Sequence, residues 1–178
     1  LNYCDNSGGS LYSAGIFLQD DSGNFSNISK NNIMGSDEGV IINYIGSGTP
    51  SDVIINDNQI NLTGINNADG IKIANGGDNH QIKNNYIENG GEDGIQVTKD
   101  PGKADNVNIT NNTIFDTRGN DGAIDYGIYC DCNNSEISFN DVINHSNGHG
   151  ISGGFSESQV FGNFISNIEE FGRAGIYL

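Results

Sequence analysis

Two short patterns alternate along the whole chain, and this repetition constrains the fold more than any other feature of the sequence. The first is a glycine followed by an apolar residue, any residue and, in most copies, a second apolar residue. Copies begin at Gly15, Gly39, Gly70, Gly94, Gly127, Gly150 and Gly175. Apolar residues at every second position are typical of a β-strand with one buried face. The intervals between these glycines are 24, 31, 24, 33, 23 and 25 residues, so the two longest predict insertions.

The second pattern places an asparagine between two apolar residues, in the order apolar, x, x, Asn, x, apolar. The copies are Ile28/Asn31/Ile33, Ile55/Asn58/Ile60, Ile82/Asn85/Ile87, Ile109/Asn112/Ile114, Ile137/Asn140/Val142 and Val160/Asn163/Ile165. Asparagine tolerates left-handed backbone, and an inward amide can form hydrogen bonds with the next repeat. We therefore predict a ladder of asparagines at a bend between strands.

Strands this short cannot stand alone, whereas parallel stacking gives each backbone a partner above and below. The sequence therefore predicts an all-β, single-stranded parallel β-helix, a solenoid of about 6–7 coils. A thin solenoid needs few core residues per coil, which fits the apolar fraction of 34%. We expect one domain over residues 1–178, as a fragment of a longer chain, because the sequence begins at Leu1 and stops inside a repeat.

Over nearly its whole length the repeat resembles the right-handed parallel β-helix superfamily. That superfamily includes pectate lyases, polygalacturonases, alginate epimerases, phage tailspikes and many surface repeat proteins. The resemblance implies a right-handed solenoid and an extracellular or cell-surface location, and it is nearly silent on function.

The net charge of −16 argues against nucleic acid and anionic membrane as partners. No apolar run is long enough for a membrane span. The end coils of a solenoid offer open strand edges, so we expect either caps or a homo-oligomer.

Acidic residues recur just before the glycines of adjacent coils, at Glu38, Asp69, Asp93 and Asp125. Adjacent coils lie about 4.8 Å apart, where two carboxylates repel by about 3.5 kcal/mol at an effective dielectric constant of about 20. A raised pKa, a bound cation or a basic neighbour such as Lys72 could relieve this repulsion. An acidic turn solvated by water is the alternative.

The second residue after each glycine should point outward. This row reads Phe17, Ile41, Lys72, Gln96, Tyr129, Ser152 and Tyr177. A mixed row of lysine, amide and aromatic side chains suits a polysaccharide lying across the coils, with Lys72, Gln96, Tyr129 and Tyr177 as substrate-binding residues. An ordinary solvated face is the alternative.

The insertion between Gly94 and Gly127 carries Lys99, Arg118 and Asp121. A loop this charged could form one wall of a cleft beside the outward row. Lys99 and Arg118 would then bind substrate, and Asp121 and Asp125 could pair with Asp93 as catalytic carboxylates.

A narrower resemblance concerns three segments. Asn67-Ala68-Asp69-Gly70, Glu92-Asp93-Gly94 and Gly148-His149-Gly150-Ile151-Ser152 resemble motifs of polygalacturonase-type glycoside hydrolases. The resemblance implies that Asp69 and Asp93 are catalytic acids of an inverting hydrolysis and that His149 assists them. Two features depart from that family: an extra coil puts His149 about 10 Å from Asp93, and Tyr177 stands where the family has an Arg-x-Lys strand.

Three functions remain open. The first is hydrolysis of an extracellular glycan by paired carboxylates, which requires no cofactor. The second is a polysaccharide lyase or epimerase in which Glu38, Asp69 and Asp93 hold Ca²⁺ and Lys72 abstracts the proton. The third is a non-catalytic surface or adhesin repeat, since methanogen surface proteins with Asn-rich β-helical repeats look similar. Archaeal disaggregatases, which loosen a chondroitin-like coat, are an enzymatic version of the same resemblance.

The cysteines and two histidines carry weaker signals. An odd count of three cysteines argues against a disulfide framework. Cys130 replaces the apolar residue of other repeats, so we expect it to be a small buried residue. His80 and His145 fall in predicted turns, where we expect them to be solvated.

Overall fold

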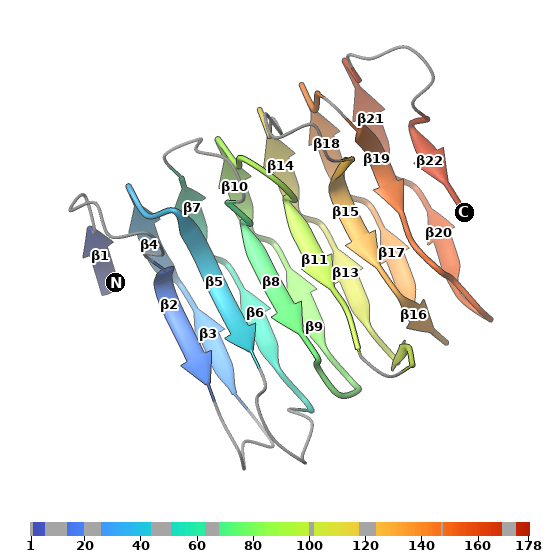
Figure 1. The fold of residues 1–178 in the computed structure, drawn as a ribbon, viewed down its shortest axis with the longest axis horizontal. Helices are drawn as coiled ribbons and strands as arrows, with labels where there is room; N and C mark the ends of the chain where they lie inside the picture. The colour runs from blue at the N-terminus through green and yellow to red at the C-terminus, as the bar shows by residue number, and fades with distance from the viewer. Residues whose placement is uncertain are drawn as a thin grey trace.

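Stacked parallel sheets make up all the regular structure of the described residues. The computed structural model describes residues 2–5, 14–19, 26–43, 51–62, 68–99, 102–117, 124–146, 148–168 and 174–178. Within these ranges every regular element is a β-strand, and each pairing between strands is parallel (Figure 1). The predicted all-β parallel solenoid is therefore confirmed. The described residues include no helix that could span a bilayer.

Three long sheets run along the solenoid, with strands that recur once per coil. Sheet A contains β1 (Asn2–Asp5), β4 (Asn31–Met34), β7 (Gln59–Asn61), β10 (Tyr86–Glu88), β14 (Thr113–Phe115), β18 (Asp141–Ile143) and β21 (Phe164–Ser166). Sheet B contains β2 (Ala14–Gln19), β5 (Glu38–Asn43), β8 (Ile71–Ala74), β11 (Ile95–Val97), β15 (Asp125–Cys130), β19 (Gly148–Ser152) and β22 (Ile176–Tyr177). Sheet C contains β3 (Asn27–Ser29), β6 (Ile54–Asn56), β9 (Gln81–Lys83), β13 (Asn108–Thr110), β17 (Glu136–Ser138) and β20 (Gln159–Phe161). A short pair is formed by β12 (Ala104–Asp105) and β16 (Cys132–Asn133).

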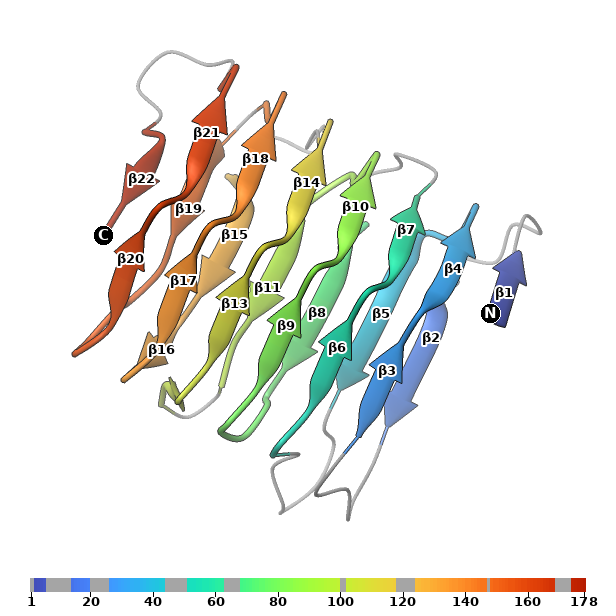
Figure 2. The ribbon, with the colours of Figure 1, turned by 180° about the vertical axis from the view of Figure 1, so that it is seen from behind.

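The chain passes from sheet A to sheet B to sheet C in each coil. Figures 1 and 2 show sheet B on one side of the solenoid and sheets A and C end to end on the other. Between them lies a core of isoleucine columns, one column for each inward position. In sheet A, for example, Ile33, Ile60 and Ile87 are paired in register and fully buried.

The repeated glycine is required by close backbone approach. A Cβ atom on Gly70 would lie 2.4 Å from the carbonyl oxygen of Gly94 and 2.4 Å from Cγ2 of Ile87. Because real Cβ contacts are essentially never this short, a larger residue at Gly70 would force its neighbours to shift.

The predicted asparagine ladder is confirmed at the bend from sheet C to sheet A. The Nδ2 of Asn58 donates to Oδ1 of Asn85 at 2.9 Å and to the carbonyl oxygen of Ile28 at 3.0 Å. The same arrangement repeats along Asn31, Asn58, Asn85, Asn112, Asn140 and Asn163. The left-handed residue is, however, the one before each ladder asparagine, such as Asp57 with φ of 57° and Asn84 with φ of 54°.

Cys130 at the end of β15 and Cys132 at the start of β16 are both buried, as predicted for Cys130. Cys130 and Cys132 are fully buried and joined in a disulfide across one intervening residue. The odd cysteine count argued against a disulfide framework, and it did not reveal this single pair, because counting cysteines does not show that two of them face the same part of the core.

The prediction that His80 and His145 are solvated is wrong, since both side chains are fully buried. His145 lies 2.7 Å from Oγ1 of Thr117 through Nδ1 and 3.1 Å from the carbonyl oxygen of Asp125 through Nε2. His80 packs beside Gly76, where a Cβ atom would lie 3.0 Å from Nε2. Burial lowers the pKa of His80 to about 4 and also lowers the pKa of His145.

Candidate functional site on sheet B

Three acidic residues stack at the corner where the chain enters sheet B. The Oε2 of Glu38 accepts a hydrogen bond from the backbone N–H of Asp69 at 2.9 Å. The Oδ1 of Asp69 accepts one from the backbone N–H of Asp93 at 3.2 Å, and Oδ1 of Asp93 accepts one from that of Tyr126 at 2.7 Å. We call Glu38, Asp69 and Asp93 the acid ladder. The prediction that these acids lie on neighbouring coils is confirmed.

The acid ladder is not a solvated turn. The residues are 7%, 0% and 2% exposed for Glu38, Asp69 and Asp93 respectively. Each carboxylate turns along the solenoid toward the backbone amide of the next coil, which removes it from water. The alternative of a water-solvated acidic turn is therefore wrong for these three residues.

Outward residues of sheet B cover the second oxygens of the two aspartates. The Nζ of Lys72 lies 2.5 Å from Oδ2 of Asp69. One coil on, Nε2 of Gln96 donates to Oδ2 of Asp93 at 2.8 Å, and Lys72 and Gln96 are paired in register. The predicted basic neighbour is therefore present for Asp69, whereas Asp93 has a neutral amide at the equivalent place.

Burial perturbs all three acids. Desolvation and the charge of Asp69 raise the pKa of Glu38 to about 7. Desolvation also raises the pKa of Asp69, although Lys72 opposes the rise. The pKa of Asp93 rises well above its ordinary value, through desolvation and then the charge of Asp69. Among the described residues, Asp69 has a cation at its carboxylate and Asp93 has a neutral amide, so the two aspartates stand in unequal electrostatic environments.

Aromatic side chains continue the same face beyond the acids. Tyr126 and His149 occupy the next two ladder positions, and Nδ1 of His149 accepts a hydrogen bond from the N–H of Ala174 at 3.0 Å. The ring centroids of Tyr126 and His149 are 6.0 Å apart, and those of His149 and Tyr177 are 4.8 Å apart and nearly parallel. Tyr129 lies 4.9 Å from Tyr126 between centroids. We call Tyr126, Tyr129, His149 and Tyr177 the aromatic cluster.

The predicted outward row is in register along sheet B. The backbone pairs join Phe17, Ile41, Lys72, Gln96, Tyr129, Ser152 and Tyr177 in that order. Tyr129 also donates from its hydroxyl to Oδ2 of Asp131 at 3.0 Å, and burial with this bond raises its pKa to about 12. The side chain of Tyr177 is 59% exposed.

His149 does not meet the aspartates. Tyr126 bonds to Asp93 on one side and is paired with His149 on the other, so a whole coil separates them. The expected departure from the polygalacturonase arrangement is therefore confirmed, and His149 belongs to the aromatic cluster instead. Tyr126 was missed by sequence reasoning, although its position before Gly127 in the ladder column could have revealed it.

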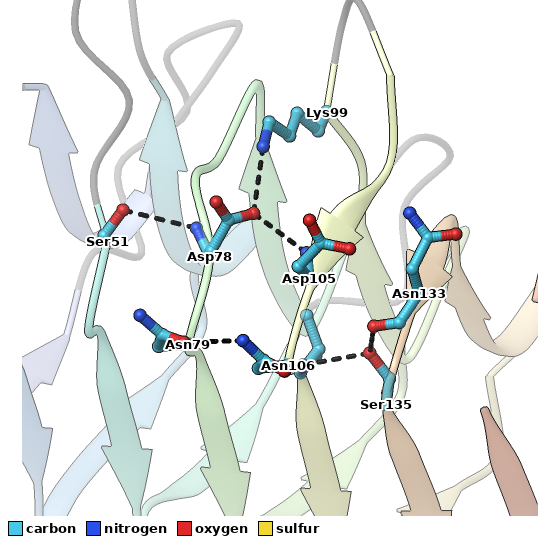
Figure 3. A network of polar contacts seen from close by, with 9 residues as sticks. Ser51, Asp78, Asn79, Lys99, Asp105, Asn106, Asn133 and Ser135 are labelled. Carbon is cyan, nitrogen blue, oxygen red and sulfur yellow. Dashed lines mark hydrogen bonds and ion pairs between the residues drawn. The ribbon is translucent and has the colours of Figure 1, made fainter. Parts of the chain in front are cut away.

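Lys99 lies away from the acid ladder, and its predicted role in binding substrate stays a prediction. It follows β11, whereas Asp93 precedes that strand, so the two residues stand at opposite corners of the coil. There Nζ of Lys99 lies 2.9 Å from Oδ1 of Asp78, which also accepts the N–H of Asp105 at 2.8 Å (Figure 3).

Three other predicted catalytic or binding residues have different outcomes. Asp125 is 1% exposed and begins β15, where it is paired with Gly148. Arg118 and Asp121 lie outside the described residues. The predicted cleft wall formed by this insertion therefore stays a prediction.

The predicted calcium ligands are Glu38, Asp69 and Asp93. Among the described residues, no group of three or more His, Cys, Asp and Glu side chains is arranged to hold a metal ion. The oxygens of Asp69 and Asp93 already accept hydrogen bonds from the chain itself. Calcium binding thus stays a prediction to which the geometry adds no support.

Comparison with known proteins agrees with the observed solenoid. A protein-family model described as "Right handed beta helix region" matches residues 2–178. No curated protein and no solved structure matches the chain.

Proposed function

The chain belongs to the right-handed β-helix family, and from this premise we propose that the outer face of sheet B binds an extracellular polysaccharide. One observation carries the proposal: Lys72, Gln96 and Tyr129 continue in register through Ser152 to Tyr177. The row offers a linear polymer the half-buried side chains of Lys72, Gln96 and Tyr129 and the exposed ring of Tyr177, whereas Ser152 between them is buried.

The side chains of this face suit sugars. Aromatic rings provide flat apolar surface on which the C–H face of a sugar can pack, and tyrosine adds a hydrogen-bonding hydroxyl. Tyr177 and His149 are stacked, so the aromatic cluster offers one ordered platform. Gln96 provides an amide for hydroxyl groups beside it. The Lys72 charge is balanced by Asp69, which favours a glycan without a high density of negative charge.

An extracellular or cell-surface location completes the proposal. A disulfide such as Cys130–Cys132 persists in oxidising compartments and is rare where thiols are kept reduced. The test is mass spectrometry after iodoacetamide treatment of the denatured protein. Without reductant we expect one cysteine to be alkylated and, after reduction, three; three in both samples would remove this support.

Binding can be tested with immobilised neutral and uronic-acid polysaccharides, followed by affinity electrophoresis on those retained. We expect Tyr177→Ala to weaken binding by about tenfold, which corresponds to about 1.4 kcal/mol. Tyr86→Ala is the matched control, because Tyr86 is 37% exposed but lies on sheet A. Equal loss in both variants, or no loss in Tyr177→Ala, would contradict the proposed face.

Glycoside hydrolysis by Asp69 and Asp93 is a second candidate, and the unequal environments of the two carboxyls favour it. Pairs of carboxyls whose surroundings drive their protonation apart are typical of acid–base catalysis. Asp93, with only neutral donors, would be the general acid, and Asp69, paired with Lys72, would be the base. Since Asp69 is fully buried, Lys72 must swing aside before a substrate reaches it.

Release of reducing ends from a bound polysaccharide separates the two candidates. Hydrolysis predicts release by the native protein and a loss of about 100-fold or more in Asp93→Asn, with binding kept. Asp141→Asn is the charge-matched control on sheet A, where the side chain is exposed. Binding without any release of reducing ends leaves a non-catalytic glycan-binding domain.

A further inference from the structure

A polar pocket lies on the opposite side of the solenoid from the outer face of sheet B. It has a volume of about 410 Å³ and opens beside the first residues of β13, β17 and β20. Asn108, Glu136 and Gln159 are paired in register across those three coils. Its polar lining also includes Asn106, Asn134, Ser135 and Glu157, and no basic or aromatic residue is among the described residues that line it. We call this hollow the sheet C pocket.

Hydrogen bonds within the chain occupy donors around the sheet C pocket. The Nδ2 of Asn106 donates to Oδ1 of Asn79 at 3.0 Å, as Figure 3 shows. The hydroxyl of Ser135 donates to the carbonyl oxygen of Asn133 at 2.6 Å and accepts the N–H of Val107 at 2.9 Å. These bonds fix the floor of the pocket and use donors that a ligand would otherwise meet.

The carboxylates of the pocket offer a ligand negatively charged hydrogen-bond acceptors. Ser138 donates to Oε1 of Glu136 at 2.5 Å, which holds that carboxylate and leaves its second oxygen. Glu157 is exposed, and its backbone is left-handed with φ of 50°. A ligand that satisfies two carboxylates and neighbouring amide oxygens must bring N–H or O–H donors and positive charge.

We propose that the sheet C pocket binds a hydroxyl-rich primary ammonium, namely a hexosamine unit with a free amine. A volume of about 410 Å³ is within the range of small-molecule sites. Two glutamates suit the ammonium, and the amides of Asn108 and Gln159 suit ring hydroxyls. The choice of a sugar over another amine rests on the proposed polysaccharide function.

Anionic and metal ligands fit the sheet C pocket less well. A uronate or phosphate would face Glu136 and Glu157, and the described lining residues include no basic side chain to balance it. A divalent cation would need more carboxylates, and the described residues contain no group of three His, Cys, Asp and Glu placed as ligands.

The experiment is isothermal titration calorimetry of the whole chain with three probes: the trimer of glucosamine, the trimer of N-acetylglucosamine, and spermidine. We expect the glucosamine trimer to bind most tightly. Glu136→Gln and Glu157→Gln should each weaken it by about fivefold, and high salt should do the same. Asp141→Asn, which removes one exposed charge from sheet A, should leave it unchanged.

Several outcomes would overturn the assignment. Equal affinity for the N-acetylated trimer would show that the pocket does not recognise the ammonium group. Equal affinity for spermidine would show that it does not recognise the sugar. A further contrary result would be that the glucosamine trimer binds both glutamate variants as tightly as the native protein and binds Tyr177→Ala more weakly. That result would place the ligand on sheet B, so it would contradict the sheet C pocket and leave the proposed function intact. Binding lost in the glutamate variants but unaffected by Tyr177→Ala supports the pocket independently of sheet B.

Discussion

Glu38 should make the stability of this solenoid depend on pH in an unusual direction. Its carboxyl is 7% exposed, and its pKa is raised from 4.5 to about 7 by burial and by Asp69. In the unfolded chain the carboxyl loses its proton near 4.5, whereas the folded chain holds that proton up to about 7. The folded state is therefore favoured below pH 4.5, and this contribution is lost as the pH rises through 7.

The size of the effect follows from the two pKa values. A difference of one pKa unit corresponds to about 1.36 kcal/mol, so the rise at Glu38 corresponds to about 3 kcal/mol. Glu38→Gln removes the titration and keeps an oxygen that can accept the N–H of Asp69. The unfolding free energy of the variant, relative to that of the native protein, should therefore rise by about 3 kcal/mol as the pH increases from 4.5 to 8.

The assay is urea unfolding followed by circular dichroism at half-unit steps from pH 4.5 to 8. The quantity compared is the difference in unfolding free energy between Glu38→Gln and the native protein at each pH. Asp141→Asn, an exposed substitution on sheet A, should show a flat difference. A flat difference for Glu38→Gln as well would refute the raised pKa and, with it, the reasoning about the buried acid ladder.

Three further substitutions test the core and the bends. The native protein should lose about 3 kcal/mol of unfolding free energy as the pH falls from 6.5 to 4, because His80 takes up a proton in the unfolded chain before it does so in the folded chain. His80→Leu should abolish this loss. Identical curves of stability against pH for the two proteins would contradict this. Asn85→Ala should cost about 2–4 kcal/mol in urea unfolding through its lost ladder bonds, and Asn27→Ala, on an exposed position, should cost little. Gly70→Ala should cost about 3 kcal/mol by thermal unfolding, whereas Gly175→Ala, whose Cβ would lie 3.8 Å from its nearest neighbour, should be tolerated; similar losses would argue against close backbone approach.

Sequence reasoning found the strands and the asparagine ladder because both are periodic. Asn58 and Asn85 stand at equal places in successive repeats, and a parallel stack brings equal places into contact. The same logic placed Asp69 and Asp93 on neighbouring coils. It did not identify which residue takes left-handed backbone, since several residue types before the ladder asparagine adopt it, including Phe139 with φ of 56°.

The candidate site was only partly predictable. The columns of sheet B, with Lys72 beside Gln96, followed from the repeat. Whether the corner acids face water did not follow, because strand alternation ends at a corner and gives no direction to a side chain there. His80 shows the same limit, since its burial depends on how the turn at Gly76 folds over it.

The amino-acid sequence by itself determined the repeat, the inward isoleucine columns and the order of residues along each face, because these depend only on period and on parallel stacking. Only the tertiary structure decided that Glu38, Asp69 and Asp93 are buried, that Lys99 pairs with Asp78, and that a polar pocket opens on sheet C. These features depend on the path of the backbone between strands, where contacts between coils, and not local pattern, fix the direction of each side chain.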